Sequence, residues 1–279
     1  MKFSEWLNLD ETLALKGDFK GSLFQRLVAA KYKLAPTQQP EAVPAFQELG
    51  RKISRQQEFL SSKFQMNPSQ ADPYHSMKAM TQDINKQKSM GVRKPVIPVY
   101  AEPPAMDGDQ QAGHPVFSND DNVKQRGVHD VIAHYYGQHP FSARGEYGAY
   151  NRHLKTLCNV NQVKAGECLA AKAMFTEVVA QTSYFYIYGT YADQKAVILD
   201  DFDHAHVGLL SSNSPLNQFF VVQNKEMSLR PDFSWDNFAV NFDDVAMELV
   251  RQEQSNKKLS PIFITLGFLT FFLMSRDLM

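Results

Sequence analysis

Four of the eight histidines in this 279-residue chain fall within residues 127–154, which read GVHDVIAHYYGQHPFSARGEYGAYNRHL. An aspartate directly follows the first histidine, and a glutamate lies between the last two. Apolar residues around them recur at helical spacing, which predicts helices over about residues 120–136 and 144–157. A carboxylate on a face of small side chains is costly to bury alone. The stretch therefore favours a fold in which several helices direct polar groups toward one point.

Helical spacing sorts the polar side chains of these two segments by face. Asp130 and His134 are four residues apart, so they share one face of the first helix, and His129 borders that face. Glu146 and His153 lie seven residues apart, two turns along one face of the second helix. Each helix is thus expected to direct at least one imidazole and one carboxylate inward.

A third helix, predicted over residues 165–188, continues the pattern. Glu177 and Gln181 are four residues apart, on a face whose other members are small or aromatic. Helical bundles build metal sites from inward-facing His and acidic side chains on neighbouring helices. The sequence therefore predicts a centre with the ligands His129, Asp130, His134, Glu146, His153 and Glu177, supported by Gln181 as a partner of the ligands.

Imidazole and carboxylate ligands suit a divalent transition metal such as Zn, Fe or Mn. Six candidate ligands are more than one tetrahedral ion needs, so either two metals bind or some of these residues support the others. For a hydrolytic centre, Glu146 or Glu177 would be the general base, and Arg126 or Arg144 would stabilise developing charge. A buried hydrogen-bond network without metal is the structural alternative.

Two other groups of histidines are expected to lie outside this centre. His139 precedes a proline and is interpreted as a surface or capping residue. His204 and His206 lie in the acidic sequence DDFDHAH, which is interpreted as a solvated turn.

Cys158 and Cys168 lack a nucleophile signature and are expected to be reduced thiols in a cytosolic protein. The H-E-x-x-H, G-x-x-x-x-G-K, G-x-G-x-x-G and G-x-S-x-G motifs are all absent from the sequence.

The order of motifs resembles a group of proteins encoded by tailed bacteriophages and prophages. It consists of HPVF at 114–117, N-x-x-x-R-x-V-H-D-x-x-x-H at 122–134, F-S-x-R-G-E-x-x-A-x-x-x-H at 141–153 and A-x-x-x-E-x-x-x-Q at 173–181. Ala133 and Ala180 replace glycines that are common in that group, which are small-for-small changes. The resemblance implies a virion-associated or structural protein with a metal-binding helical domain.

A weaker resemblance is to HD-type phosphohydrolases, which use an adjacent His and Asp on one helix. His129 and Asp130 would take those positions. The class also needs an upstream histidine and a downstream aspartate, for which His114 and Asp200 or Asp201 are available.

Four regions follow one another along the chain. Residues 1–90 are expected to be helical, 91–119 to form a proline-rich ordered loop with an extended segment at 96–100, and 120–257 to form the helical metal-binding domain. Residues 194–203 and 216–222 are predicted strands, and 235–254 an amphipathic helix. The chain is therefore expected to be mainly α, with a few short strands and a C-terminal hydrophobic helix.

Charge is distributed unevenly although the net charge is only -1. Residues 1–100 carry 15 Lys or Arg against 9 Asp or Glu, and the remainder carries 14 against 21. A basic first third could contact phosphate or anionic lipid, but a solvated helical surface is the favoured explanation, and no specific nucleic-acid binding is predicted.

The segment 259–274, LSPIFITLGFLTFFLM, contains no charged residue, and Lys257 and Lys258 precede it. It predicts a short membrane-spanning tail anchor at residues 258–279, with the large domain on the cytoplasmic side. A buried helix or a contact in a homo-oligomer is the alternative.

The sequence as a whole leaves three functions open. The first is a particle-associated phage protein with a metal centre, linked to a membrane or to other virion proteins. The second is a metal-dependent hydrolase, and the third is a non-catalytic interaction protein.

Overall fold

The structure is a computed structural model that describes residues 21–71, 73–101, 113–159, 161–162, 166–223 and 226–259, the last six of these without side-chain detail. It is mainly helical with four short strands among the described residues. The expected helical class is thereby confirmed. The apolar segment lies outside the described residues except for Leu259. No helix in the described part is long and apolar enough to cross a membrane.

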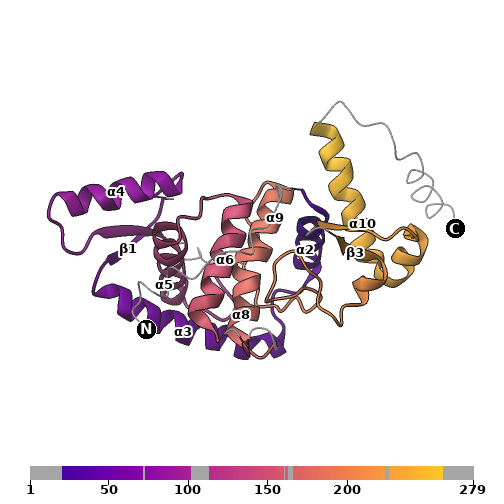
Figure 1. Ribbon diagram of the computed structural model, residues 1–279, viewed down its shortest axis with the longest axis horizontal. Helices are drawn as coiled ribbons and strands as arrows, with labels where there is room; N and C mark the ends of the chain where they lie inside the picture. The colour runs from indigo at the N-terminus through magenta and orange to yellow at the C-terminus, as the bar shows by residue number, and fades with distance from the viewer. Residues whose placement is uncertain are drawn as a thin grey trace, which may run out of the picture.

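The elements follow one another in an order that alternates long helices with short connecting pieces (Figure 1). They are α2 (Leu23–Leu34), η1 (Pro40–Ala42), α3 (Val43–Ser61), β1 (Gln65–Ser69), α4 (Met77–Ser89), β2 (Val96–Tyr100), α5 (Asn119–His129), η2 (Asp130–Tyr136), α6 (Ala143–Leu157), α8 (Leu169–Met174), η3 (Phe175–Ala180), α9 (Gln181–Tyr188), η4 (Pro215–Gln218), β3 (Phe220–Gln223), β4 (Glu226–Leu229) and α10 (Trp235–Leu259).

The helices α5, α6 and the run from α8 to α9 stand beside one another in the middle of the molecule (Figure 1). α3 crosses beneath them and contacts α5 and α8. On α3, the apolar stripe of Phe46, Leu49, Ile53 and Leu60 is buried, as its helical spacing predicts. Ser118 caps α5 in a capping box with Asp121, which fixes where that helix begins.

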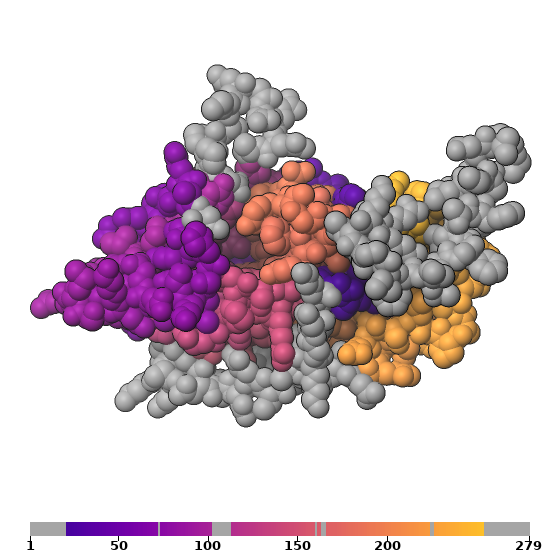
Figure 2. Space-filling model, turned by 90° about the horizontal axis from the view of Figure 1, so that it is seen from above, coloured from indigo at the N-terminus to yellow at the C-terminus, as the bar shows by residue number. Residues whose placement is uncertain are grey.

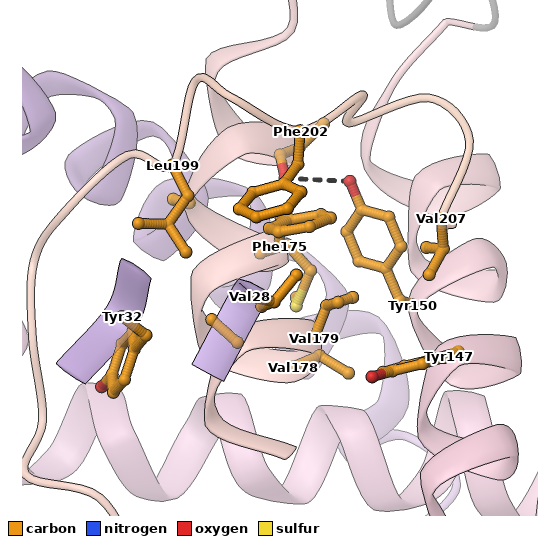
Figure 3. Packing of buried hydrophobic residues seen from close by; sticks show 14 of the residues in the cluster. Val28, Tyr32, Tyr147, Tyr150, Phe175, Val178, Val179, Leu199, Phe202 and Val207 are labelled. Atoms are coloured by element: carbon orange, nitrogen blue, oxygen red, sulfur yellow. Dashed lines mark hydrogen bonds between the residues drawn. The ribbon is translucent and has the colours of Figure 1, made fainter. Parts of the chain in front are cut away.

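Aromatic side chains fill the core between α2, α6 and the α8–α9 run (Figure 3). Phe175 stacks on Phe202 with ring centroids 5.9 Å apart and meets Tyr150 edge to face. The Tyr147 hydroxyl pairs with Ser183 at 2.7 Å, and the Tyr150 hydroxyl lies 2.5 Å from the carbonyl oxygen of His204 and 3.3 Å from that of Ala171. These buried hydrogen bonds fix how α6 sits against the α8–α9 run.

The strands form two separate pairs. β1 and β2 are parallel, with Gln65 opposite Val96, and β3 and β4 form an antiparallel hairpin. The extended segment 96–100 is therefore confirmed, whereas β1 was missed within the region expected to be helical. Residues 194–203 form only isolated bridges at Ala196 and Phe202, and 216–222 begins as a 3-10 turn before β3.

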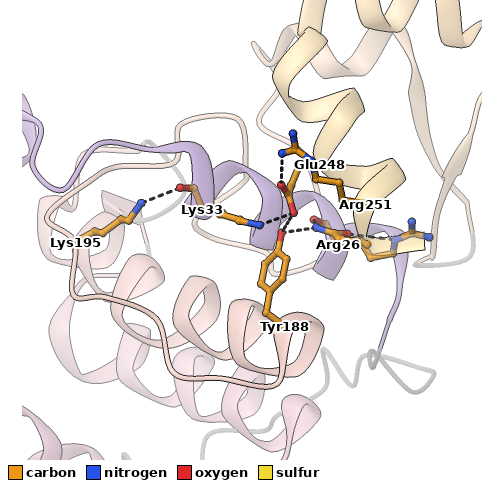
Figure 4. A network of polar contacts seen from close by, with 7 residues as sticks. Arg26, Lys33, Tyr188, Lys195, Glu248 and Arg251 are labelled. Atoms are coloured by element: carbon orange, nitrogen blue, oxygen red, sulfur yellow. Dashed lines mark hydrogen bonds and ion pairs between the residues drawn. The ribbon is translucent and has the colours of Figure 1, made fainter. Parts of the chain in front are cut away.

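α10 is tied to α2 and α9 by a polar network around Glu248 (Figure 4). The Glu248 side chain is 1% exposed and accepts from Lys33 Nζ at 3.0 Å and from the Tyr188 hydroxyl at 2.7 Å. Arg251 Nη1 lies 3.3 Å from its other oxygen. A buried carboxylate is costly unless paired, so these contacts specify where α10 packs.

The two cysteines form a disulfide, so the prediction of reduced thiols was wrong. Cys158 follows the last residue of α6 and Cys168 precedes the first residue of α8, with their Cα atoms 6.1 Å apart. The reason is tertiary: the two helices pack side by side, which brings these ends together. Spacing alone does not reveal that proximity.

Candidate metal centre

Two π-helical segments interrupt the helices that carry the predicted ligands. In η2, the Gly137 amide donates to the carbonyl oxygen of Ile132, and at the end of η3 the Gln181 amide donates to that of Thr176. Each bond spans five residues, whereas an α-helix spans four. A wider turn brings residues five apart onto one face. Such π segments are rare and recur at functional sites.

The π turn changes which residues of the first helix converge. α-Helical spacing pairs Asp130 with His134, but the structure brings His129 and His134 together, with their Nε2 atoms 2.9 Å apart. Asp130 is half-buried. Glu146 is the main cause of the raised pKa of His129, and the negative charge of Asp130 adds to that effect.

Glu146 of α6 completes a group of three ligand atoms. Its Oε2 lies 3.1 Å from His129 Nε2, and its Oε1 lies 3.4 Å from His134 Nε2. Among the described residues, His129, His134 and Glu146 are the group of His, Cys or acidic side chains whose ligand atoms lie within 4.8 Å of one another. This set of two imidazoles and one carboxylate could hold a metal ion.

The other ring nitrogen of each histidine is already engaged. His134 Nδ1 lies 2.7 Å from the carbonyl oxygen of His139 and must donate to it, which leaves a lone pair on Nε2. His129 Nδ1 lies 3.0 Å from Nε2 of His153. His153 therefore stands behind His129, on the side away from Glu146. Metal-ligating histidines almost always donate their second N–H to a carboxylate, a backbone carbonyl or water, and the His139 carbonyl is such a partner for His134.

Two glycines let the loop after η2 fold against α6. A Cβ atom on Gly145 would lie 1.8 Å from the carbonyl oxygen of Pro140, and one on Gly148 would lie 2.6 Å from the His139 ring. Both positions require the absence of a side chain because backbone or ring atoms occupy the space. The close approach that these glycines allow places the His139 carbonyl at Nδ1 of His134 and Glu146 at Nε2 of the same ring.

The centre is enclosed on one side and open on the other. The His134 side chain is 2% exposed, whereas those of His129 and Glu146 are 17% and 18% exposed. Burial lowers the pKa of His134 to about 4, although the nearby Glu146 charge partly offsets it. His134 is therefore a neutral imidazole at neutral pH and offers its Nε2 lone pair.

Glu146 and His129 stabilise each other's charged forms. Burial opposes the charge on His129, but the hydrogen bond and charge of Glu146 outweigh it and raise the His129 pKa. Burial likewise opposes the Glu146 carboxylate, but His129 and His134 outweigh it and lower the Glu146 pKa. Burial, followed by the charges of His129 and His134, holds the pKa of His153 well below its ordinary value.

Glu177 and Gln181, predicted as a ligand and a supporting residue, lie outside this group of three and face other side chains. Glu177 Oε1 lies 3.3 Å from His114 Nε2, and both side chains are buried. His114 Nδ1 accepts from the amides of Val116 and Phe117, so the neutral ring carries its proton on Nε2, facing Glu177. Gln181 Nε2 lies 3.4 Å from Gln194 Oε1.

The two arginines considered for charge stabilisation lie at different places. Arg126 donates to the carbonyl oxygen of Tyr100 at 3.1 Å and covers the Tyr100 ring, at the end of β2. Arg144 is exposed in the first turn of α6, two residues before Glu146.

The residues for an HD-type arrangement have other partners as well. His114 faces Glu177, Asp200 lies 3.3 Å from Lys172, and Asp201 pairs with Lys31 at 2.7 Å. In the same acidic loop, Asp203 pairs with His206 at 3.0 Å.

Sequence reasoning missed two contributors. His139 was expected to lie outside the centre, yet its carbonyl orients His134 and its ring influences the pKa of His134, Glu146 and His153. A backbone acceptor leaves no signal in the residue type. Tyr186 of α9 is the second: burial and then the charge of Glu146 raise its pKa. No spacing within α9 points to it, because it approaches Glu146 from another helix.

Comparisons with protein-family models, with curated proteins and with solved structures gave no match for this chain.

Proposed function

We propose that the chain binds one divalent transition metal through His129, His134 and Glu146, and that this centre activates water for hydrolysis. The observation that carries the proposal is the orientation of the two imidazoles. Each has its Nδ1 engaged by a partner, His153 or the His139 carbonyl; His129 directs its Nε2 at Oε2 of Glu146, and His134 directs its Nε2 at Oε1. A purely structural network does not require three metal-binding atoms to face one point.

The spacing of these atoms fits a metal ion. Separations of 2.9, 3.1 and 3.4 Å join the three side chains. Ligands about 2.0–2.1 Å from a tetrahedral zinc ion lie roughly 3.3 Å apart. The three groups therefore need little movement to share one ion.

The donor set favours Zn, Fe or Mn, as expected from the sequence. Two histidines and one carboxylate leave a coordination position free, which distinguishes catalytic from closed structural zinc sites. A bound metal of this kind lowers the pKa of a coordinated water and polarises a substrate carbonyl or phosphoryl oxygen. The exposed edges of His129 and Glu146 face the side from which water and substrate would approach.

The chain's own residues have separate roles in this proposal. His134 is the rigid ligand, since burial and the His139 carbonyl fix its ring. His129 is the ligand oriented by His153. Both oxygens of Glu146 face the two imidazoles, so it is assigned to metal ligation and not to proton abstraction. Without metal, one proton on His129 Nε2 can bridge to Glu146 and His134, so metal and proton compete for the same place.

Metal analysis of the purified protein tests this proposal. We expect about one equivalent of transition metal per chain, lost in H129A, H134A and E146Q. H206A is the matched control, because His206 pairs with Asp203 in the acidic loop and away from the three ligands, and it should retain full occupancy. Absence of metal from the parent protein, with thermal stability unchanged by a chelator, would instead support a buried hydrogen-bond network.

Hydrolytic activity is a separate question from metal binding. Phosphodiester and peptide substrates should be cleaved by the metal-loaded protein and not by E146Q. Turnover that survives in E146Q would come from a contaminant or another site. Metal binding without turnover of either class would remove the hydrolase part of the proposal.

The motif order supports a second proposal, a particle-associated phage protein in which the same metal stabilises the helical domain. Glu146 and His153 belong to the motif on which that resemblance rests, and in the structure both contact His129. Removing metal should then lower the melting temperature while no substrate is turned over, and the chain should be detected in purified particles.

A further inference from the structure

A basic lobe projects from one end of the molecule. It consists of β1, α4 and β2 and lies at the left of Figures 1 and 2, at the end opposite α10. Its described residues, 61–71 and 73–101, include one acidic residue, Asp83, and six basic residues. All six basic side chains are exposed: Lys63, Lys78, Lys86, Lys88, Arg93 and Lys94. The described part of this lobe therefore carries five more basic than acidic residues.

Few of these basic side chains are neutralised by contacts within the protein. The Asp83 carboxylate is half-buried and accepts hydrogen bonds from the Tyr74 hydroxyl at 2.8 Å and Gln87 Nε2 at 3.0 Å. Lys88 is held against Tyr135, with Nζ 2.8 Å from the hydroxyl. In the described part of the chain, no carboxylate lies within ion-pair distance of the remaining cations of the turn and of the outer face of α4: Lys78, Lys86, Arg93 and Lys94.

Apolar side chains occupy the middle of the basic turn between α4 and β2. Met90 is 72% exposed and Val92 is 39% exposed, and Gly91 between them has a φ of +83°, which a glycine adopts without strain. The sequence KQKSMGVRK thus presents Met90 and Val92 with cations on both sides. A single exposed apolar residue is ordinary, but an apolar tip framed by cations at the end of a lobe fits a surface that is both anionic and apolar.

We propose that this basic lobe docks on an anionic phospholipid bilayer. Met90 and Val92 enter the boundary between head groups and acyl chains, while Lys86, Arg93 and Lys94 lie over the lipid phosphates. Burial of the two apolar side chains is favourable there. On a nucleic acid the same side chains would face charged phosphates, which is why a lipid surface is favoured. The proposal is independent of the metal centre.

A fluorescent probe at the tip tests the docking directly in the full chain. The chain has two cysteines, both in the disulfide, so M90C adds one reactive thiol for a polarity-sensitive dye. Vesicles containing phosphatidylglycerol should shift its emission to the blue, whereas pure phosphatidylcholine vesicles should not. Y191C is the matched control, because Tyr191 is 83% exposed but lies after α9, outside the basic lobe, and its dye should not respond.

Charge variants separate docking by the lobe from attachment through the apolar segment 259–274. Each cation near an anionic lipid surface contributes about 1 kcal/mol, or roughly fivefold in affinity. In the M90C background, R93Q/K94Q should therefore raise the half-saturating concentration of anionic lipid by about 25-fold. R51Q/R55Q makes the same charge change on exposed residues of α3 and should leave it nearly unchanged.

Three results would overturn the proposal. The first is no emission shift at M90C with anionic vesicles. The second is an equal shift with neutral vesicles, which would show docking that does not need the cations. The third is an equal loss of lipid affinity in R93Q/K94Q and R51Q/R55Q, which would show that binding depends on the overall charge of the protein and not on the lobe. If the protein binds DNA at physiological salt while the dye at M90C shows no emission shift with vesicles, this surface would be assigned to nucleic-acid binding.

Discussion

His134 Nδ1 lies 2.7 Å from the carbonyl oxygen of His139, five residues further along the chain. This contact decides what His134 can do. It fixes the proton on Nδ1, so Nε2 is a lone pair aimed at His129 and Glu146. The carbonyl is held in place by the tight turn that follows η2, and that turn depends on Gly145 of the next helix.

Gly145 offers the most direct test of that turn. In G145A the new Cβ would collide with the Pro140 carbonyl, which lies 1.8 Å from its position, so the loop carrying His139 must move. Loss of a partner that orients a metal ligand typically costs 10–100-fold in metal affinity. We expect a loss of about that size, measured by competition with a chelator of known affinity.

S142A is the control for G145A, since the Ser142 side chain caps α6 at the Gly145 amide and makes no hydrogen bond to the three ligand side chains. It should cost about 1 kcal/mol of stability and leave metal affinity almost unchanged. If G145A binds metal as tightly as the parent, the His139 carbonyl does not orient His134.

His153 and His134 should respond differently to substitution, although both were predicted as ligands. His153 Nε2 faces His129 Nδ1, so in H153A the ring of His129 loses its orientation but the three ligand atoms remain. Metal affinity should fall about 10–100-fold with stoichiometry retained at saturating metal. H134A should lose the site altogether. Equal loss of stoichiometry in both variants would make His153 a ligand, as the sequence suggested.

How far the sequence predicted this centre depends on helix geometry. The helices, their order and the involvement of His129, His134 and Glu146 follow from composition and spacing. The pairing of Asp130 with His134 came from assuming 3.6 residues per turn. The structure has a π segment at that point, so residues five apart converge instead. The sequence VIAHYY shows no feature that distinguishes a π turn from an α turn.

Other differences have tertiary causes. β1 lies in a stretch rich in polar residues, and its pairing with β2 depends on a contact about thirty residues along the chain. Glu177 was placed on the inner face of its helix, which is where it lies, but its neighbour His114 comes from a proline-flanked loop with no helical phase to follow. The Cys158–Cys168 disulfide likewise depends on two helix ends meeting.

Metal binding should weaken in acid because a proton competes for His129. Its pKa is raised in the folded protein, since Glu146 outweighs the effect of burial. Below that pKa the site holds a proton that the metal must displace, so affinity should fall about tenfold per pH unit as the pH decreases. Chelator competition at several pH values measures this. A parent affinity independent of pH would contradict the proposed competition.

His204 should make the fold sensitive to acid independently of the metal. Burial lowers its pKa to about 4, and its ring packs edge to face on Phe175 at 5.0 Å. In the unfolded chain His204 takes up a proton near pH 6.5, whereas in the folded chain it stays neutral down to about pH 4. The free energy of unfolding should therefore fall by about 2–3 kcal/mol between pH 6.5 and 4.

H204Q separates the contribution of His204 from those of His134 and His153, whose pKa values are also lowered by burial. Urea unfolding at pH 7 and pH 4.5 should show a smaller difference in H204Q than in the parent. H75Q, at an exposed position on the basic lobe, should behave like the parent. If H204Q and the parent lose equal stability in acid, His204 is not the cause.

Glu248 should be the strongest single anchor of α10. Its side chain is 1% exposed and paired with Lys33, Tyr188 and Arg251 (Figure 4). E248A leaves those groups without their acceptor at the interface with α2 and α9, and removing one partner of a buried ion pair costs about 3–5 kcal/mol. Because Lys33 is partly exposed, we expect a loss at the lower end, about 3 kcal/mol, in urea unfolding. E253A removes a neighbouring acid whose pair with Arg26 is at the surface, and it should cost at most about 1 kcal/mol. Similar losses in both variants would show that burial of Glu248 adds nothing to the packing of α10.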